Sequence, residues 1–316
     1  MMTNYAIVHG DDPDGLICGA FLYRLTGCEV YLANYDNLDK ALARVQPPTT
    51  NLYVCDLNIR EELAPELRRI RAFSEITIID HHQMDQPLID ELRTLGVSVT
   101  LDSQDCAAVL VYYAYKETLG YEAARLAGYA AISDMFDEGP LASELLSRMD
   151  RKFVQHEAHI LTHALGKDQT IDFKRAIIYE LSRYSYPHRI AGAVEAAMEC
   201  LEEMAAVKEA IPGAAEIRGR LAIMEAMGSQ STGTIANLLM DTLGVDVGVG
   251  YKLNGEYLNV SLRGERNLRE HLGDLSKELG RTLGGFGGGH QRASGVKLPK
   301  DQLTEFIDQL SRRLNP

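Results

Sequence analysis

The sequence predicts an α/β fold: a mostly parallel five-stranded sheet flanked by helices, then a helical connector and a smaller α+β domain. Three observations support this prediction. Short apolar runs alternate with amphipathic helical segments over residues 1–140, a pattern typical of βαβ units. Helical patterns then continue from about 141 to 211. After them, strand and helix patterns mix around Asn254-Gly255, a dipeptide that favours a two-residue hairpin.

The predicted strands of the sheet are short and apolar, as buried parallel strands are. They are YAIVH, EVYLA, NLYVCD, EITIID and VSVTLD, at residues 5–9, 29–33, 51–56, 75–80 and 97–102. Between them lie helical segments such as GLICGAFLYRLTG, in which Ile17, Phe21 and Leu25 recur at helical spacing. All but one of these strands end at or just before His9, Asp56, Asp80 or Asp102. Ligands of open α/β sheets bind beyond the carboxyl ends of the strands, so we expect a site at this edge.

The later elements predict where the domains divide. We expect a first domain over 1–185, a helical linker over 186–213 and a C-terminal domain over 214–316. Pro187 suits the first turn of the linker helix, and Pro212-Gly213 suits its end. The C-terminal domain is predicted to contain the helix STGTIANLLMDTLG, the strands VDVGVGYKL and EYLNVSLRG, a helix around 267–280 and a closing helix over about 300–314.

Composition excludes several classes of protein. A chain of 316 residues with 46% hydrophobic composition can form two cores. The five cysteines form no CxxC pair, which argues against a disulfide framework and a structural zinc site. The net charge of -13 disfavours the coating of long nucleic acid. Without a membrane-length apolar run or a signal-peptide pattern, we expect a cytoplasmic protein with no membrane partner.

The strand ends carry side chains suited to metal binding. HGDDPDG alone is also an ordinary turn signature, but IIDHHQMD places Asp80, His81 and His82 together after a strand. Asp56 and Asp134 fit the same edge, although each could instead cap a helix. Carboxylates and imidazoles without thiolates suit Mn²⁺ or Mg²⁺. Five or six ligands exceed the need of one ion, so we expect two divalent ions and, as their chemistry, phosphoester hydrolysis.

Taken together, these motifs resemble a known family. HGDDPDG, VCD, IIDHH and ISD occur in the order and approximate spacing of the four motifs of the DHH phosphoesterase superfamily. GGGHQRASG resembles the GGHxxAAG-type signature of the DHH-associated domain found in RecJ-like exonucleases, nanoRNases and related phosphodiesterases. The resemblance covers the chain except for the helical middle. It implies two domains facing across a cleft, with a dimanganese centre on the first and substrate-binding residues on the second.

The resemblance also implies roles for the strand-end residues. His9 and Asp12 would bind one ion and Asp14 the other, Asp56 would bridge them, and His81 and Asp134 would complete the coordination. Asp80 would orient His81, and His82 would face the scissile phosphate as a hydrogen-bond donor or leaving-group acid.

One departure concerns the first motif. Family members commonly show H-x-D-x-D-G, whereas an extra residue separates His9 from D-x-D-G here. Asp11 and Asp12 are therefore both open as the ligand. We expect Asp12, because it keeps the D-x-D-G spacing with Asp14.

Substrate binding is predicted for the C-terminal domain. Arg263 resembles the family's SxR position that grips the substrate, although it could be a surface residue at a strand end. The glycine-rich segment permits close approach of backbone N–H groups to an anion, although glycines alone would suit a flexible hairpin. Its embedded cations favour phosphate or nucleotide binding, and the candidate residues there are Gly288, Gly289, His290 and Arg292.

We therefore expect a hydrolase that degrades short oligonucleotides to mononucleotides, as nanoRNases do, with 3'-phosphoadenosine 5'-phosphate as a further candidate substrate. The acidic charge and the lack of an aromatic and basic stacking platform favour small substrates over long single strands, and we expect no long duplex nucleic acid as a partner. A cyclic-dinucleotide phosphodiesterase is the alternative enzyme, and a non-catalytic nucleotide-binding protein on a DHH fold is the other class. The sequence leaves open the substrate length and sugar type, the cleavage polarity, the role of residues 141–185 and the oligomeric state, a homodimer being one option.

Overall fold

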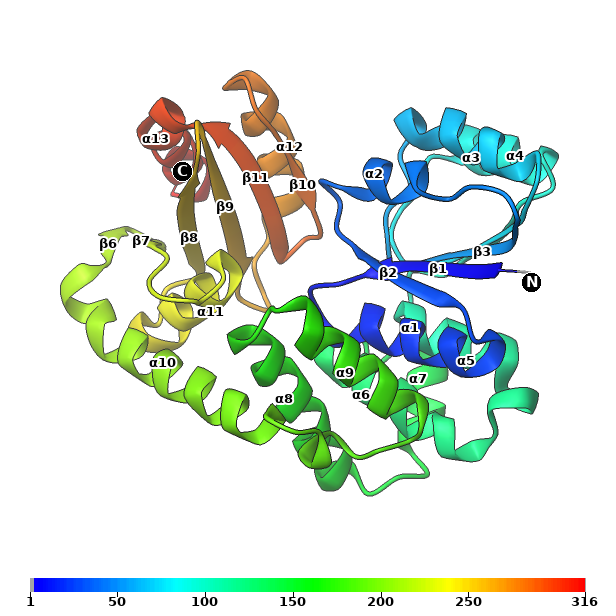
Figure 1. Cartoon of the computed structure of the whole chain (residues 1–316). Helices are drawn as coiled ribbons and strands as arrows, with labels where there is room; N and C mark the ends of the chain where they lie inside the picture. The colour runs from blue at the N-terminus through cyan, green and yellow to red at the C-terminus, as the bar shows by residue number, and fades with distance from the viewer. Residues whose placement is uncertain (1–2, 316) are drawn as a thin grey trace. The chain divides into compact units, whose positions relative to one another are not determined.

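The computed structural model describes residues 3–315 (Figure 1). The chain forms two compact units, the first ending at Met198 and the second beginning at Glu199. Each contains its own sheet.

The sheet of the first unit is wholly parallel, with the strand order β2-β1-β3-β4-β5. Its strands are β1 (Thr3–His9), β2 (Glu29–Ala33), β3 (Thr49–Cys55), β4 (Glu75–Asp80) and β5 (Ser98–Leu101). They coincide with the five predicted strands to within two residues at each end, so the predicted fold class is confirmed. Because the strands are parallel, their carboxyl ends lie at one edge of the sheet.

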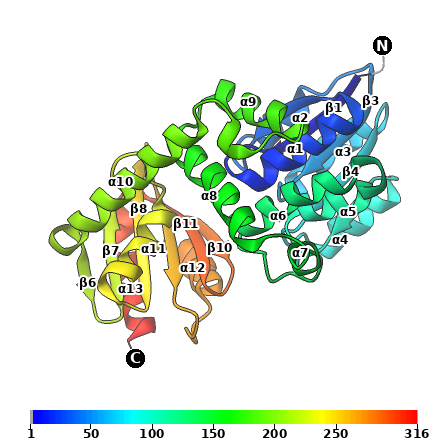
Figure 2. The ribbon, with the colours of Figure 1, turned by 90° about the horizontal axis from the view of Figure 1, so that it is seen from below.

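Helices cover both faces of this sheet (Figures 1 and 2). Ile7 on β1 packs into the core formed with α2 (Leu38–Ala43), α3 (Ala64–Arg71) and α4 (Gln86–Thr94). Its neighbour Val8 packs into the opposite core, as the alternation of strand side chains requires. That core contains α1 (Pro13–Thr26), α5 (Ala107–Leu119), α6 (Ala124–Ser133), α7 (Pro140–Leu146), α8 (Arg151–Lys167) and α9 (Ile171–Ser182). Burial on both faces explains why the central strands β1, β3 and β4 are mostly apolar.

The long helix α10 (Ala193–Ala214) begins later than the sequence predicts. Pro187 opens the short 3-10 turn η3 (Pro187–Arg189) instead, and Gly192 then has a φ of 81°, which breaks the helical path before Ala193. At the other end, the helix continues through Pro212 to Ala214. Pro212 therefore does not end it, because a proline near the last turn removes only one of the helix's backbone hydrogen bonds.

The sheet of the second unit is mixed, with the order β10-β11-β9-β8-β7-β6. Its strands are β6 (Glu216–Arg218), β7 (Leu221–Glu225), β8 (Val247–Asn254), β9 (Tyr257–Gly264), β10 (Phe286–Gly289) and β11 (Ala293–Pro299), and its helices are α11 (Thr232–Leu243), α12 (Leu272–Thr282) and α13 (Leu303–Leu314). The hairpin β8–β9 pairs Asn254 with Tyr257, and Gly255 takes the positive φ of 62° that its turn requires. The predicted hairpin is therefore present, but its two-residue turn is Gly255-Glu256, one position later than the predicted Asn254-Gly255, because Asn254 still belongs to β8.

Among residues 3–315, no helix combines the length and the apolar character needed to cross a bilayer.

Candidate metal centre and substrate-binding residues

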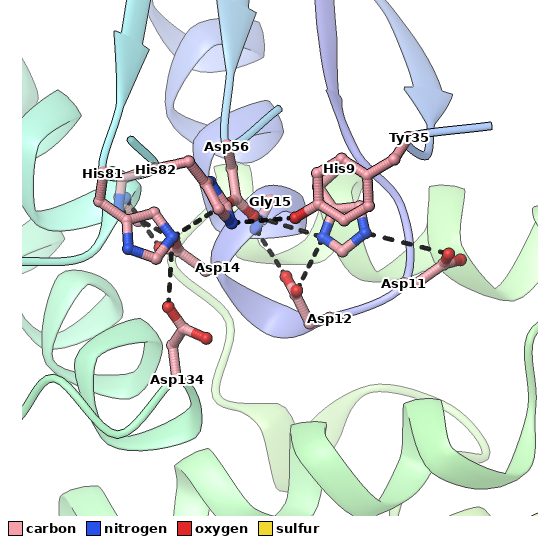
Figure 3. Close-up of polar contacts among 12 residues, drawn as sticks. His9, Asp11, Asp12, Asp14, Gly15, Tyr35, Asp56, His81, His82 and Asp134 are labelled. Carbon is pink, nitrogen blue, oxygen red and sulfur yellow. Dashed lines mark hydrogen bonds and ion pairs between the residues drawn. The ribbon is translucent and has the colours of Figure 1, made fainter. Parts of the chain in front are cut away.

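The candidate metal residues meet at the carboxyl edge of the first sheet (Figure 3). His9 and Asp80 are the last residues of β1 and β4, and Asp56 directly follows β3 between them. Asp12 and Asp14 lie at the start of α1, and Asp134 follows the last turn of α6. Three adjacent strands and two helices thus bring together the residues that the sequence predicted for this site.

Gly15 allows α1 to start directly against the end of β1. Asp12 caps the helix by accepting a 3.1 Å hydrogen bond from the Gly15 backbone N–H. A Cβ atom on Gly15 would lie 2.1 Å from the backbone oxygen of His9, so no larger residue fits here. This close approach holds Asp12 and Asp14 beside His9.

His9, Asp12 and Asp56 form the first group of potential ligands. The His9 Nδ1 atom lies 2.7 Å from Asp12 Oδ2 and 3.5 Å from Asp56 Oδ2. Asp56 has a φ of 60°, a conformation that non-glycine residues adopt rarely and often at functional sites. Asp11 instead meets the ammonium group of Lys174 at 3.0 Å. The geometry therefore favours Asp12 over Asp11 as the ligand.

Asp14, His81 and Asp134 form a second group. The His81 Nε2 atom lies 3.5 Å from Asp134 Oδ2 and 3.2 Å from Asp56 Oδ1. The two oxygens of Asp56 thus face one group each. Asp14 also stabilises the start of α5. Its oxygens accept hydrogen bonds of 2.9 and 2.8 Å from the backbone N–H groups of Ala107 and Ala108.

Asp80 holds the ring of His82. Its Oδ1 atom lies 2.8 Å from His82 Nδ1 and also accepts hydrogen bonds from the backbone N–H groups of His81 and His82. This corrects the expectation that Asp80 orients the His81 ring. The physical reason is the turn after β4: the backbone folds around the Asp80 carboxylate and brings the second histidine back to it, while His81 turns toward Asp56 and Asp134.

Burial and mutual repulsion raise the pKa of three carboxyl groups in this cluster. Burial, with the charges of neighbouring carboxylates, raises the pKa of Asp14 and Asp56 to about 7 and that of Asp134 to about 10. For His9, burial acts against the charged form, but Asp12 and Asp56 outweigh it and raise the pKa to about 11. Burial lowers the pKa of His81 and so favours its neutral imidazole.

These properties fit divalent cations. One oxygen each of Asp56, Asp80 and Asp134 is buried and makes no hydrogen bond within the part of the chain that the structure describes. Buried carboxylate oxygens are costly without a positive partner. The donor set of carboxylates and imidazoles, with no thiolate among the clustered atoms, matches ions such as Mn²⁺ and Mg²⁺.

In the second unit, Arg263 lies near the end of β9 and is suited to anion binding. Its Nε atom is buried without a hydrogen-bond partner among the described residues, and burial lowers the pKa of its guanidinium. Its Nη1 atom donates to the Leu262 carbonyl at 3.0 Å. A Cβ atom on Gly233 would lie 2.7 Å from Arg263 Nη2, so this glycine leaves room for the side chain.

The glycine-rich segment forms the hairpin of β10 and β11. Its glycines let α12 approach closely: a Cβ atom on Gly287 would lie 2.6 Å from the Ser276 carbonyl oxygen. The carbonyls of His290 and Gln291 accept hydrogen bonds from the first N–H groups of α12, so these groups already have partners. His290 and Arg292 are exposed in the hairpin loop, and Gly288 has open space on its Cα side. Packing against α12 thus explains Gly287, whereas His290 and Arg292 are exposed to solvent.

This two-unit architecture is similar to that of known proteins. The family model of the DHHA1 domain matches residues 221–315. The DHH domain of a protein described as a member of a family of ribosomal proteins superposes with a TM-score of 0.71, covering 99% of this chain and 86% of that chain at 15% identity. Both halves of the predicted architecture are thereby accounted for. Residues 221–315 thus match a DHHA1 domain, and the chain shares its overall fold with a DHH-domain structure.

Two further solved structures share the fold of this chain. A pGpG-specific phosphodiesterase from Vibrio cholerae has a TM-score of 0.60, 12% identity and 99% coverage of both chains. RecJ from Thermus thermophilus in complex with Mn²⁺ has a TM-score of 0.62 and 18% identity, covering 98% of this chain and 52% of that chain. Among curated sequences, an uncharacterised protein of Methanocaldococcus jannaschii is 36% identical over 80 residues, which span 25% of this chain and only 18% of that protein.

The candidate metal site has two further neighbours that the sequence did not single out. The Tyr35 hydroxyl lies 3.0 Å from His82 Nε2, and its ring centroid lies 5.1 Å from that of His9. Tyr35 follows β2 by two residues, so its place after a predicted strand was the available signal. Lys174 lies in α9, whose ordinary amphipathic pattern gave no such signal. Figure 3 shows Tyr35 beside His9 and His82.

Proposed function

We propose that this chain is a metal-dependent phosphodiesterase that hydrolyses short oligonucleotides to mononucleotides with two divalent ions, preferentially Mn²⁺. The observation that carries the proposal is the pair of ligand groups that meet at Asp56, with its oxygens facing one group each. One ion would be held by His9, Asp12 and Asp56, and the other by Asp14, Asp56, His81 and Asp134. The Mn²⁺ in a RecJ structure and the dinucleotide pGpG named for another relative support the choice of metal and substrate.

The ions would polarise the phosphate oxygens and lower the pKa of the attacking water. The protein's own part is to hold the ligands in position. Asp12 is fixed by capping α1, and Asp14 by the first N–H groups of α5. Asp134 is placed by its position after α6 and by the contact of its Oδ2 atom with His81 Nε2 at 3.5 Å, and that oxygen makes no hydrogen bond to the described residues.

His82 is proposed to hold or donate a proton at the leaving oxygen. Burial acts against its charge, but Asp80 outweighs this and raises the pKa of His82. With Nδ1 bonded to Asp80, the Nε2 atom faces the Tyr35 hydroxyl at 3.0 Å. A substrate oxygen could replace that hydroxyl as the partner of Nε2.

Residues of the DHHA1 domain are proposed to bind the substrate's phosphates. Arg263 is half-buried and offers a buried Nε–H group without a partner among the described residues, and guanidinium groups bind phosphate through paired hydrogen bonds. Arg292, His290, Gly288 and Gly289 belong to the same hairpin or its loop. They are proposed as secondary contacts.

Hydrolysis of pGpG by the metal-free protein, with and without added Mn²⁺, tests the proposal. We expect turnover only with the metal. His82→Ala should lower kcat by about 10²–10⁴-fold, the usual contribution of general acid-base catalysis, and leave Mn²⁺ binding intact. Arg263→Ala should chiefly raise KM. The Mn²⁺-loaded protein should also be tested on linear and cyclic dinucleotides and on 3'-phosphoadenosine 5'-phosphate. If it turns over none of them, the enzyme proposal is contradicted and a binding protein is favoured.

A further inference from the structure

Asp11, the additional acid of HGDDPDG, faces away from the other carboxylates. Its Oδ2 atom lies 4.0 Å from His9 Nε2, and its Oδ1 atom lies 3.0 Å from the ammonium group of Lys174. His9 therefore divides its two nitrogens between different partners. Nδ1 faces Asp12 and Asp56, whereas Nε2 faces Asp11 (Figure 3).

Lys174 is an unusual partner because its side chain is buried. The residue is only 7% exposed, and it lies on α9, which packs against α1. A buried ammonium group is costly unless an opposite charge and hydrogen bonds compensate it. The contact between Lys174 and Asp11 therefore restrains the Asp11 carboxylate more than an exposed ion pair would, because Lys174 belongs to a helix of the core.

The contacts of His9 with Asp11, and of Asp11 with Lys174, match what a metal-binding histidine requires. A neutral imidazole has one N–H, and a carboxylate beside one nitrogen fixes the proton there and leaves the lone pair of the other nitrogen for the metal. We propose that Asp11 and Lys174 are positioning residues for His9. Asp11 accepts the Nε2 hydrogen when Nδ1 binds a divalent ion, and Lys174 holds Asp11 in place.

The 4.0 Å separation is that of an ion pair and exceeds a hydrogen bond. The Asp11 side chain is half-exposed, so rotation about its side-chain bonds can close the distance. The inference rests on the proposed metal site but extends it, since it assigns a role to the extra acid of the first motif and to the helical region between the sheet and α10.

Mn²⁺ binding to the metal-free full-length chain tests this inference, with the electron paramagnetic resonance signal of free Mn²⁺ as the readout. Loss of a carboxylate behind a metal-bound histidine typically costs about 10–100-fold in affinity. We expect Asp11→Asn to weaken Mn²⁺ binding by that amount and Lys174→Met to weaken it in the same direction. Because the two residues act in series, the double variant should bind about as weakly as Asp11→Asn alone.

Glu91→Gln is the matched control. It removes the exposed ion pair of Arg68 and Glu91 in the same unit and should leave Mn²⁺ affinity unchanged. Equal affinity of Asp11→Asn and the unaltered protein would overturn the inference. So would a Lys174→Met variant that binds Mn²⁺ normally but has a raised KM, because Lys174 would then contact the substrate.

The outcomes separate this inference from the proposed function. Asp11→Asn changes a half-exposed side chain, so it remains a test even where Lys174→Met fails to fold. Weakened Mn²⁺ binding in Asp11→Asn, together with no hydrolysis by the unaltered loaded protein, would contradict the proposed function alone. Normal hydrolysis with unchanged Mn²⁺ affinity in both variants would contradict the positioning role alone.

Discussion

At the scale of single residues, several candidate metal ligands at the sheet edge are protonated in the metal-free protein, so a metal ion has to displace their protons when it binds. The pKa of His9 is raised to about 11 and that of Asp134 to about 10, so both are protonated at neutral pH in the metal-free protein. Asp14 and Asp56, each raised to about 7, are partly protonated. Metal ligands have to lose these protons. Mn²⁺ binding is therefore expected to release protons and to weaken as the pH falls from about 8 to 6.

Calorimetric titration of the metal-free protein with Mn²⁺ checks this at pH 7. The heat should vary between buffers of different ionisation enthalpy, in proportion to the protons that are released. Identical heats in all buffers, with an affinity independent of pH, would mean that the ligands are already deprotonated.

Asp14 and Asp134 are both proposed ligands, but only Asp14 also supports the fold. Both of its oxygens accept backbone hydrogen bonds from α5, and an asparagine would leave one buried N–H without an acceptor, at a cost of about 1–3 kcal/mol. The buried oxygen of Asp134 has no such bond among the described residues. In the metal-free protein, Asp14→Asn should therefore lower the free energy of unfolding by that amount, whereas Asp134→Asn should leave it unchanged or raise it.

Urea unfolding of the two metal-free variants measures this difference, while Mn²⁺ binding should be weakened in both. Equal losses of stability would show that the contact between Asp14 and α5 contributes little.

How far the sequence predicts the site also becomes clear at the level of residues. Parallel strands share one carboxyl edge, so the strand-end position of His9, Asp56 and Asp80 was enough to predict that they meet. The pairing of Asp80 with His82 was not predictable, because it depends on the turn after β4 and not on any spacing along the chain. Lys174 was missed for a related reason: it reaches Asp11 across 163 positions through the packing of α9 on α1.

At the scale of elements, the junction of β1 and α1 is the contact on which the first ligand group depends. A Cβ atom at Gly15 would lie 2.1 Å from the His9 backbone oxygen, so Gly15→Ala has to push the helix away from the strand. Overpacking of this kind typically costs about 1–3 kcal/mol. We expect a lower melting temperature and weaker Mn²⁺ binding, because Asp12 and Asp14 move with the helix.

Gly213→Ala in α10 is the control for the glycine substitution. A Cβ atom there meets nothing within 4 Å, so the alanine should be neutral or stabilise the helix by up to about 1 kcal/mol. Circular dichroism melts of the metal-free variants compare the two. A Gly15→Ala protein that melts and binds Mn²⁺ normally would show that the junction tolerates the shift.

Element boundaries show where local patterns fail. The central strands β1, β3 and β4 were predictable because most of their apolar residues are buried, and the half-buried edge strands β2 and β5 were predictable from their short runs of apolar and β-branched residues. The start of α10 was not, because Pro187 also suits the 3-10 turn that precedes it. The glycine-rich hairpin was open to two interpretations, and the approach of α12 to β10, which explains Gly287, is a tertiary contact invisible in the sequence.

At the scale of the whole molecule, net charge bears on the length of the substrate. The chain carries a formal charge of -13, so each phosphate beyond those bound by local cations meets an unfavourable field. Screening limits this repulsion to a distance of about 8 Å at physiological salt, which leaves a dinucleotide at the cationic contacts largely unaffected. We therefore expect kcat/KM to be highest for short oligonucleotides and to fall for a long single strand of the same sequence. Added KCl should narrow the gap by screening the repulsion. A preference for the long strand that falls steeply with salt would instead reveal a cationic groove that follows the nucleic-acid backbone, and would place the chain with enzymes of long strands.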